Sequence, residues 1–181
     1  MASAPMWVFG YGSLMWNPGF AVAERVVATL GDHARTFCMR SIHHRGTVDD
    51  PGLVLALDPC PGTTCIGLGI RVAEGAEAVT LEELRARELI SSAYVERILP
   101  LVLSDGRAVR AVAYVVDTDH VQYCGGLPLE QQAQIIARAV GGRGPNTEYL
   151  FNTAAHLAEL GIPDPDLAWL DARVREILTT G

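Results

Sequence analysis

The chain has 181 residues, of which 49% are hydrophobic and 19% charged, and its formal net charge is −7 at pH 7. This composition is typical of a globular protein rather than a disordered one, and the length suits one domain over residues 1–181. The acidic balance argues against nucleic acid as the main partner, because binding phosphates requires a basic face. It does not exclude a small anionic substrate, which a local pair of arginines can bind.

The N-terminal residues, the apolar runs and the cysteines indicate the cellular compartment. Residues 1–5 lack the basic and apolar regions of a secretory signal, and no apolar run reaches the roughly 18 residues of a membrane span. The cysteines follow no paired or metal-binding spacing, so we expect them to be reduced. They are Cys38, Cys60, Cys65 and Cys124. These features predict a cytoplasmic protein with no membrane contact.

The first half of the chain is predicted to be rich in β-strands, and two further strands are predicted after it. Short apolar or alternating runs are separated there by Gly, Pro and Asp clusters. The predicted strands are residues 7–9, 22–30, 34–39, 53–57, 66–72, 94–103 and 108–117. The last two flank the turn at 104–106 and predict a hairpin.

Helical patterns occur once between these strands and then fill the C-terminal third. The first helix is predicted from Thr80 and Glu83, which have the spacing of a capping box. The C-terminal helices are predicted at 128–140, 146–161 and from 164 or 166 to 178. Strands first and helices last favour an α+β fold, a small mixed sheet or β-barrel with flanking helices. A doubly wound parallel fold fits less well, because strands and helices do not alternate.

The first candidate site is the turn after the strand at residues 7–9. Its two glycines, Gly10 and Gly12, allow backbone N–H groups to approach a ligand closely. A dinucleotide fingerprint would need a glycine at Met15, and the hydrolase nucleophile elbow would need one at Tyr11 as well. The segment is therefore either a ligand-binding turn or only a tight turn after an edge strand.

The second candidate is Glu88, which shares a helix face with Leu81 and Leu84. A carboxylate on the apolar side of a helix is unusual, because desolvating its charge is costly. It either pairs with a core arginine, reaches solvent at the helix end, or acts as a general acid–base whose pKa is raised by burial. On the polar side, we expect Glu83 to pair with Arg87 at i+4.

A third candidate is the loop at 40–47, which contains two arginines and two histidines. Such a loop either recognises an anion or is simply solvated. His43 and His44 are adjacent, a spacing that does not suit a metal site.

The fourth candidate is the segment 144–150. Asn146 or Thr147 is expected to cap the helix that begins there. Tyr149 in its first turn, and Tyr94 just after the Glu88 helix, either line a pocket or pack in the core.

Taken together, these segments resemble the ChaC-type γ-glutamylcyclotransferases over nearly the whole chain. The matching segments, in order, are FGYGSL at 9–14, HRGT at 44–47, PGLVLAL at 51–57, RE at 87–88, NTEYL at 146–150 and HL at 156–157. Several motifs in the same order are far more specific than any one of them. The resemblance implies a small mixed sheet or barrel with flanking helices. It also implies an enzyme that converts glutathione to 5-oxoproline and cysteinylglycine without a cofactor, a metal or an obligate protein partner.

The same resemblance implies roles for individual residues. The γ-glutamyl group is held by Tyr11, Gly12, Ser13 and Leu14, and Glu88 is the general acid–base. Further pocket residues are expected to be Arg40, Arg45, Tyr94 and Tyr149. Two alternatives stay open: a related cyclotransferase for other γ-glutamyl amines or amino acids, and a non-enzymatic protein that binds a γ-glutamyl ligand or a regulatory partner in the same pocket.

Overall fold

The computed structural model describes residues 5–89 and 92–180, and the chain forms two compact units. The first unit contains Met1–Arg35 and Leu57–His120, and the second contains Thr36–Ala56 and Val121–Gly181. Two long strands, β2 (Val22–Ser41) and β3 (Gly52–Val72), run from one unit into the other. Each of them joins two stretches that the sequence predicts as separate strands.

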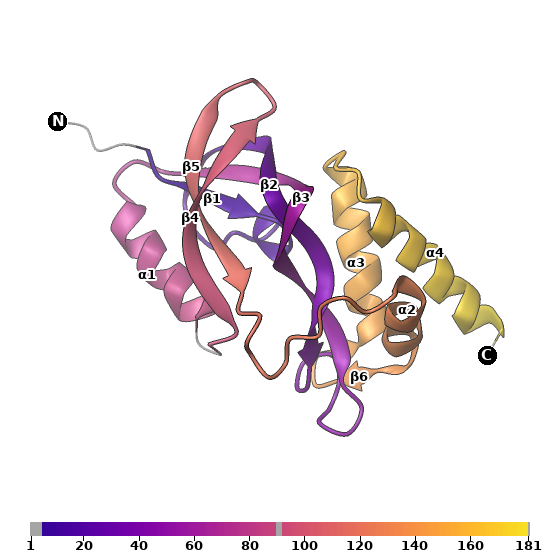
Figure 1. Ribbon diagram of the computed structural model, residues 1–181. Helices are drawn as coiled ribbons and strands as arrows, with labels where there is room; N and C mark the ends of the chain where they lie inside the picture. Colours follow the sequence, from indigo (N-terminus) through magenta and orange to yellow (C-terminus); the bar gives the residue numbers. More distant parts are fainter. Residues whose placement is uncertain (1–4, 90–91, 181) are drawn as a thin grey trace. The chain divides into compact units, whose positions relative to one another are not determined.

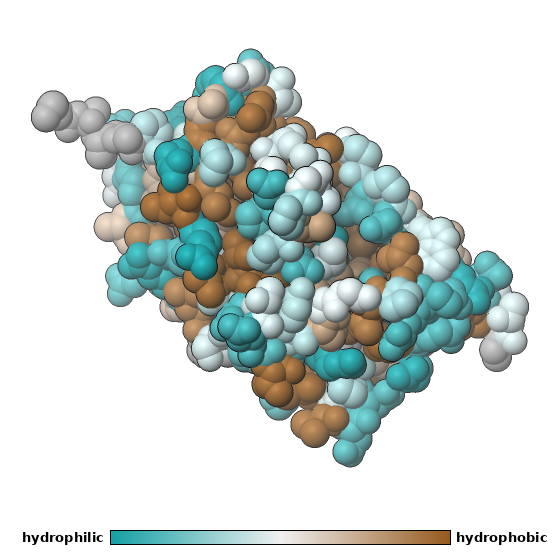
Figure 2. Space-filling view, viewed as in Figure 1, coloured by the Kyte–Doolittle hydropathy of each residue, from teal (hydrophilic) through white to brown (hydrophobic). Residues whose placement is uncertain are grey.

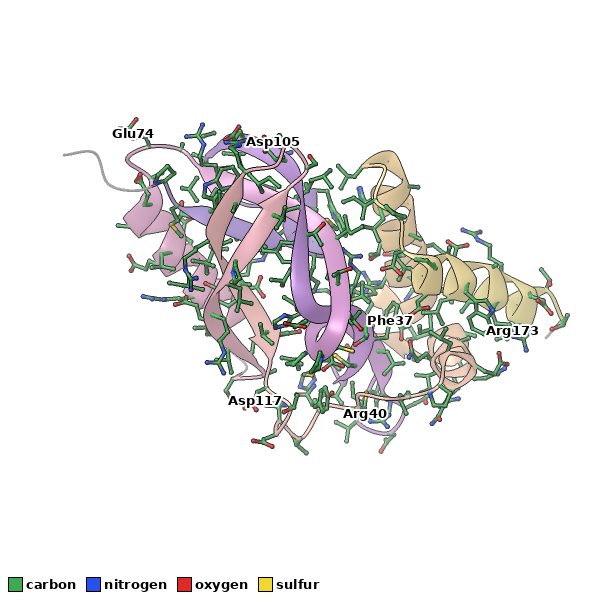
Figure 3. All side chains as sticks on the ribbon, turned by 45° about the horizontal axis from the view of Figure 1, so that its top comes forward. Phe37, Arg40, Glu74, Asp105, Asp117 and Arg173 are labelled. Carbon is green, nitrogen blue, oxygen red and sulfur yellow. The ribbon has the colours of Figure 1, made fainter. Side chains whose placement is uncertain are left out.

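Five strands close into a barrel in the order β1-β3-β2-β4-β5 (Figure 1). β1 (Trp7–Gly10) pairs antiparallel with β3 and parallel with β5 (Ala108–Val116), so the sheet is mixed. β4 (Tyr94–Leu103) pairs antiparallel with both β2 and β5. The predicted hairpin is confirmed, and its turn uses Gly106 at φ 94°, a conformation that favours glycine. Figure 3 labels Asp105 in this turn.

Alternate residues of β1 and β5 belong to different apolar clusters, as the two-residue period of a strand requires. One cluster fills the barrel and draws from these two strands Trp7, Phe9, Ala111, Ala113 and Val115. The other lies on the opposite face and includes Val8, Val112 and Tyr114 with Leu14 and Leu84. Residues 111–116 are therefore all buried, because apolar groups cover both faces of β5.

Helix α1 (Glu77–Glu88) packs through Leu84 onto the second of these clusters. The predicted capping box is wrong, because Thr80 lies inside the helix and is only 1% exposed. The helix begins about one turn earlier, where the backbone N–H of Gly75 donates to both carboxylate oxygens of Glu77 at 3.0 and 2.9 Å. A carboxylate suits the first turn because the helix N-terminus carries partial positive charge.

The second unit contains three helices that pack together: α2 (Leu129–Arg138), α3 (Asn146–Glu159) and α4 (Pro165–Thr180) (Figure 1). A short hairpin of β6 (Val140–Gly141) and β7 (Gly144–Pro145) connects α2 to α3. The predicted helical C-terminal third and the α+β class are confirmed, with helix ends shifted by a few residues.

None of the helices among the described residues combines the length and the apolar character needed to cross a bilayer. Figure 2 shows hydrophilic and hydrophobic side chains interspersed over the face in view.

Candidate active site

After β1 the chain turns through Tyr11 and Gly12 into a short 3₁₀ helix, η1 (Ser13–Met15). The turn is closed by its own backbone: Met15 N donates to Gly12 O at 2.9 Å, and Asn17 N donates to Ser13 O at 2.7 Å. We call residues 10–17 the substrate turn, because they include residues 11–14, for which the family resemblance implies a role in substrate binding. Because these bonds are local, the turn has a defined shape without a ligand.

The two glycines of the substrate turn differ in how closely other atoms surround them. A Cβ on Gly10 would lie 3.2 Å from the backbone N of Met15 and 3.3 Å from Cδ1 of Ile70, which is tighter than side chains normally pack. A Cβ on Gly12 would meet nothing within 4 Å. Gly10 therefore lets β1 approach η1 closely, whereas Gly12 faces open space.

The start of the substrate turn is held by Arg35 of β2. Its Nε donates to the carbonyl oxygen of Tyr11 at 2.6 Å, and its Nη2 donates to the carbonyl oxygen of Ile66. The Arg35 residue is only 8% exposed, and charged donors form stronger hydrogen bonds than neutral ones. The sequence analysis missed this residue. The signal that could have found it is its alternation with Phe37 two positions later on the same strand face.

Glu88 is the last residue of α1, and its side chain is 18% exposed. Burial raises the pKa of this carboxyl above its ordinary value, and the charge of Arg87 partly opposes the shift. Among the described residues no group donates a hydrogen bond to it, since Nε of Arg87 is 3.6 Å from Oε1. The carboxyl therefore holds a proton more readily than an ordinary glutamate, as a group that both accepts and returns protons must.

Arg87 connects α1 with the substrate turn. Its Nη2 donates to Ser13 Oγ at 3.0 Å, and its Nη1 donates to the carbonyl oxygen of Asn17 at 3.1 Å. The predicted pair of Arg87 with Glu83 is wrong within the described part of the chain, because the guanidinium is used by the turn and by Glu88 instead.

The substrate turn and α1 also meet through apolar contacts. Leu14 belongs to the same buried cluster as Leu84 and Tyr114, and Tyr94 packs against that cluster. The Tyr114 hydroxyl donates to Glu96 Oε1 at 3.0 Å. Burial chiefly raises the pKa of Tyr114, with smaller contributions from the charges of Glu96 and Glu88. The charge of Glu88 thus affects the pKa of Tyr114, a residue that the sequence analysis did not single out.

The other predicted pocket residues lie in the second unit. Arg40, labelled in Figure 3, is near the end of β2, and its backbone N donates to Gln122 O at 2.8 Å. The Nη1 of Arg45 donates to Pro145 O at 3.1 Å, and the guanidinium lies over the Tyr149 ring at 5.8 Å from its centroid. These contacts bind the 40–47 loop to its own unit, and a role in recognising substrate stays a prediction.

The polar groups at the start of α3 are bonded to β3. Asn146 is not the predicted helix cap, because Pro145 precedes the first helical turn and no side chain caps it. Instead Asn146 Oδ1 accepts from Leu53 N at 2.8 Å, and Nδ2 donates to Leu53 O at 2.9 Å. The Tyr149 hydroxyl accepts from Leu55 N at 3.0 Å, and burial raises the pKa of Tyr149 to about 12. The Asn146 and Tyr149 side chains therefore bond to β3 rather than to the first turn of α3.

Comparison with known proteins identifies the family to which this chain belongs. The ChaC-like protein family matches residues 6–177. The chain belongs to this family. The glutathione-specific γ-glutamylcyclotransferase of Escherichia coli (strain K12) is 38% identical over 96% of this chain and 74% of its own length. The γ-glutamylcyclotransferase 2-3 of Arabidopsis thaliana is 33% identical over 96% of this chain and 90% of its own length.

The fold of this ChaC-like protein is shared with a solved relative. The crystal structure of a γ-glutamylcyclotransferase specific to glutathione from yeast superposes with a TM-score of 0.82 at 24% identity, covering 96% of this chain and 97% of that one. Within the ChaC-like chain, the structure collects Tyr11, Gly12, Ser13, Leu14, Glu88 and Tyr94 in the first unit. Arg40, Arg45 and Tyr149 belong to the second.

Proposed function

We propose that this ChaC-like protein is a glutathione-specific γ-glutamylcyclotransferase with Glu88 as its general acid–base. The observation that carries the proposal is the mostly buried carboxyl of Glu88, whose pKa is raised by burial and which is linked through Arg87 to the substrate turn. The names of the Escherichia coli and yeast relatives support glutathione as the substrate. The enzyme acts in the cytoplasm as a single domain over residues 1–181, on a small molecule and without cofactor or obligate partner.

The chemistry is an intramolecular acyl transfer. The α-amino nitrogen of the γ-glutamyl group attacks its own γ-carbonyl carbon and closes a five-membered lactam. Because both ends are tethered, the enzyme need only hold the bent conformer and move protons. Glu88 accepts a proton from the attacking amine and returns it to the leaving amide nitrogen as the C–N bond breaks. The products are 5-oxoproline and cysteinylglycine, and no water is consumed.

The substrate turn supplies the remaining interactions. Backbone N–H groups around Gly12 bind the glutamyl α-carboxylate or the oxyanion that develops on the γ-carbonyl, in the open space beside that glycine. Tyr11, Ser13 and Leu14 shape this turn. We propose Arg40, Arg45, Tyr94 and Tyr149 as further residues of the binding pocket.

The decisive assay uses the purified protein with glutathione and excess EDTA, and measures 5-oxoproline and cysteinylglycine by mass spectrometry. We expect both products in equal amounts. N-acetyl-glutathione should give none, because acetylation removes the nucleophile. γ-Glutamyl-alanine run alongside tests the specificity, and faster turnover of that dipeptide would favour the broader cyclotransferase. If neither substrate gave 5-oxoproline, the proposed cyclotransferase activity would be refuted.

A further inference from the structure

The guanidinium of Arg87 presents each of its three nitrogens to a different group. Nη2 contacts Ser13 Oγ at 3.0 Å, Nη1 contacts Asn17 O at 3.1 Å, and Nε lies 3.6 Å from Glu88 Oε1. Adjacent residues on a helix do not face each other. The long side chain of Arg87 nevertheless contacts the substrate turn and approaches the neighbouring carboxyl.

The two hydrogen bonds bind the first residue of η1 and a residue just beyond its last one. Ser13 is its first residue, and Asn17 is the residue whose backbone N–H returns to Ser13 O at 2.7 Å. A guanidinium is planar and its donors have a fixed geometry, so bonds to Ser13 and Asn17 set the spacing between η1 and the end of α1. The apolar contact of Leu14 with Leu84 supports the same spacing without fixing its orientation.

We propose that Arg87 is a positioning residue for the cyclisation: it holds the substrate turn at a fixed distance from the Glu88 carboxyl and applies its charge to that carboxyl. This inference rests on the proposed function. We assign Arg87 to the turn rather than to the substrate's carboxylate, because Nη1 and Nη2 already donate to oxygens of the turn. Its charge opposes the effect of burial on the pKa of Glu88, and so favours the ionised form that accepts a proton.

Two substitutions separate the hydrogen bonds of Arg87 from its charge. Arg87→Lys keeps the positive charge but lacks the forked pair of nitrogens that bonds Ser13 and Asn17. Arg87→Gln keeps a donor for one of them and removes the charge. The experiment measures kcat and KM for glutathione with both variants across the acidic and neutral pH range, and records thermal melting of each.

For Arg87→Lys we expect the acid limb of kcat/KM at the same pH as in the wild type, with kcat/KM lowered about threefold to tenfold, the equivalent of a lost hydrogen bond. For Arg87→Gln we expect the acid limb to move to higher pH, because the charge that lowers the pKa of Glu88 is gone. A merely structural role would not move this limb.

The matched control is Arg110→Gln. Arg110 is exposed on β5 of the same unit and donates to the carbonyl oxygen of Ile98 at 3.2 Å. Its pH profile and KM should equal those of the wild type. An Arg87→Gln profile that superimposes on the wild type would overturn the inference, as would equal rises in KM for both variants with no shift. If the wild-type protein made no 5-oxoproline, the proposed function itself would be refuted.

Discussion

The C-terminal end of α1 and the N-terminal end of α3 each carry a polar cluster, and the two clusters differ in how their hydrogen-bonding atoms are used. At α3, both amide atoms of Asn146 bond to Leu53, and the Tyr149 hydroxyl bonds to Leu55. At α1, the Glu88 carboxyl is mostly buried, and among the described residues no group donates a hydrogen bond to it.

This difference separates groups that stabilise a fold from a group that can react. A buried polar atom with its partners in place contributes to stability and resists chemical change. A buried carboxyl without such partners costs free energy to ionise, and this cost raises its pKa toward the range that suits acid–base catalysis. The α3 cluster therefore joins a loop, a strand and a helix, whereas the α1 cluster has the properties of an acid–base.

The largest expected effect that tests this comparison is on Glu88→Gln. The amide keeps the shape of the side chain but cannot exchange a proton, and loss of a general acid–base lowers kcat about 10²- to 10⁴-fold. Formation of 5-oxoproline measures kcat, and thermal melting verifies folding. Turnover near that of the wild type would show that the carboxyl is not the reacting group.

For Asn146→Ala we expect a loss of stability. The substitution leaves the N–H and C=O of buried Leu53 without their partner, and each such group costs about 1–3 kcal/mol. Asn152→Ala, at an exposed position of the same helix, serves as control and should change stability by less than about 0.5 kcal/mol. Urea denaturation measures both. Equal stabilities for the two variants would contradict the structural role of Asn146.

A smaller effect is expected for Tyr149→Phe, which removes the acceptor of the Leu55 N–H. The free energy of unfolding should fall by about 1 kcal/mol. Measuring kcat/KM on the same sample tests the pocket role predicted for this tyrosine. If activity falls by an order of magnitude while stability is unchanged, Tyr149 belongs with Glu88 rather than with Asn146.

The smallest effect concerns stability and pH. Burial raises the pKa of Glu88 in the folded protein, so its contribution to stability is lost as pH rises from the unfolded value through the folded one. Glu88→Gln should therefore melt at a higher temperature than the wild type above that window, and the advantage should disappear in acid. Glu82→Gln, an exposed change on the same helix, is the control and should show no such crossover.

The fold class and most elements follow from local patterns in the sequence. Alternation predicts the strands, and the order of strands before helices predicts the α+β class. Glu88 stands out in the sequence as a carboxylate on an apolar helix face, and the structure confirms that its side chain is mostly buried. The bonds of Asn146 and Arg35 could not be foreseen, because their partners lie 93 and 24 residues away and depend on the register of β3 and on the path of the turn. Local helix rules misassigned Arg87, whose partners Ser13 and Asn17 are also distant in sequence.

The anchor that Arg35 provides has a consequence for how this protein responds to acidity. A guanidinium keeps its proton throughout the physiological pH range. The bonds from Arg35 to the carbonyl oxygens of Tyr11 and Ile66 therefore persist while the Glu88 carboxyl changes its protonation. A fall in pH should slow turnover in a graded and immediately reversible way, since it neutralises the base and leaves the geometry of the turn intact.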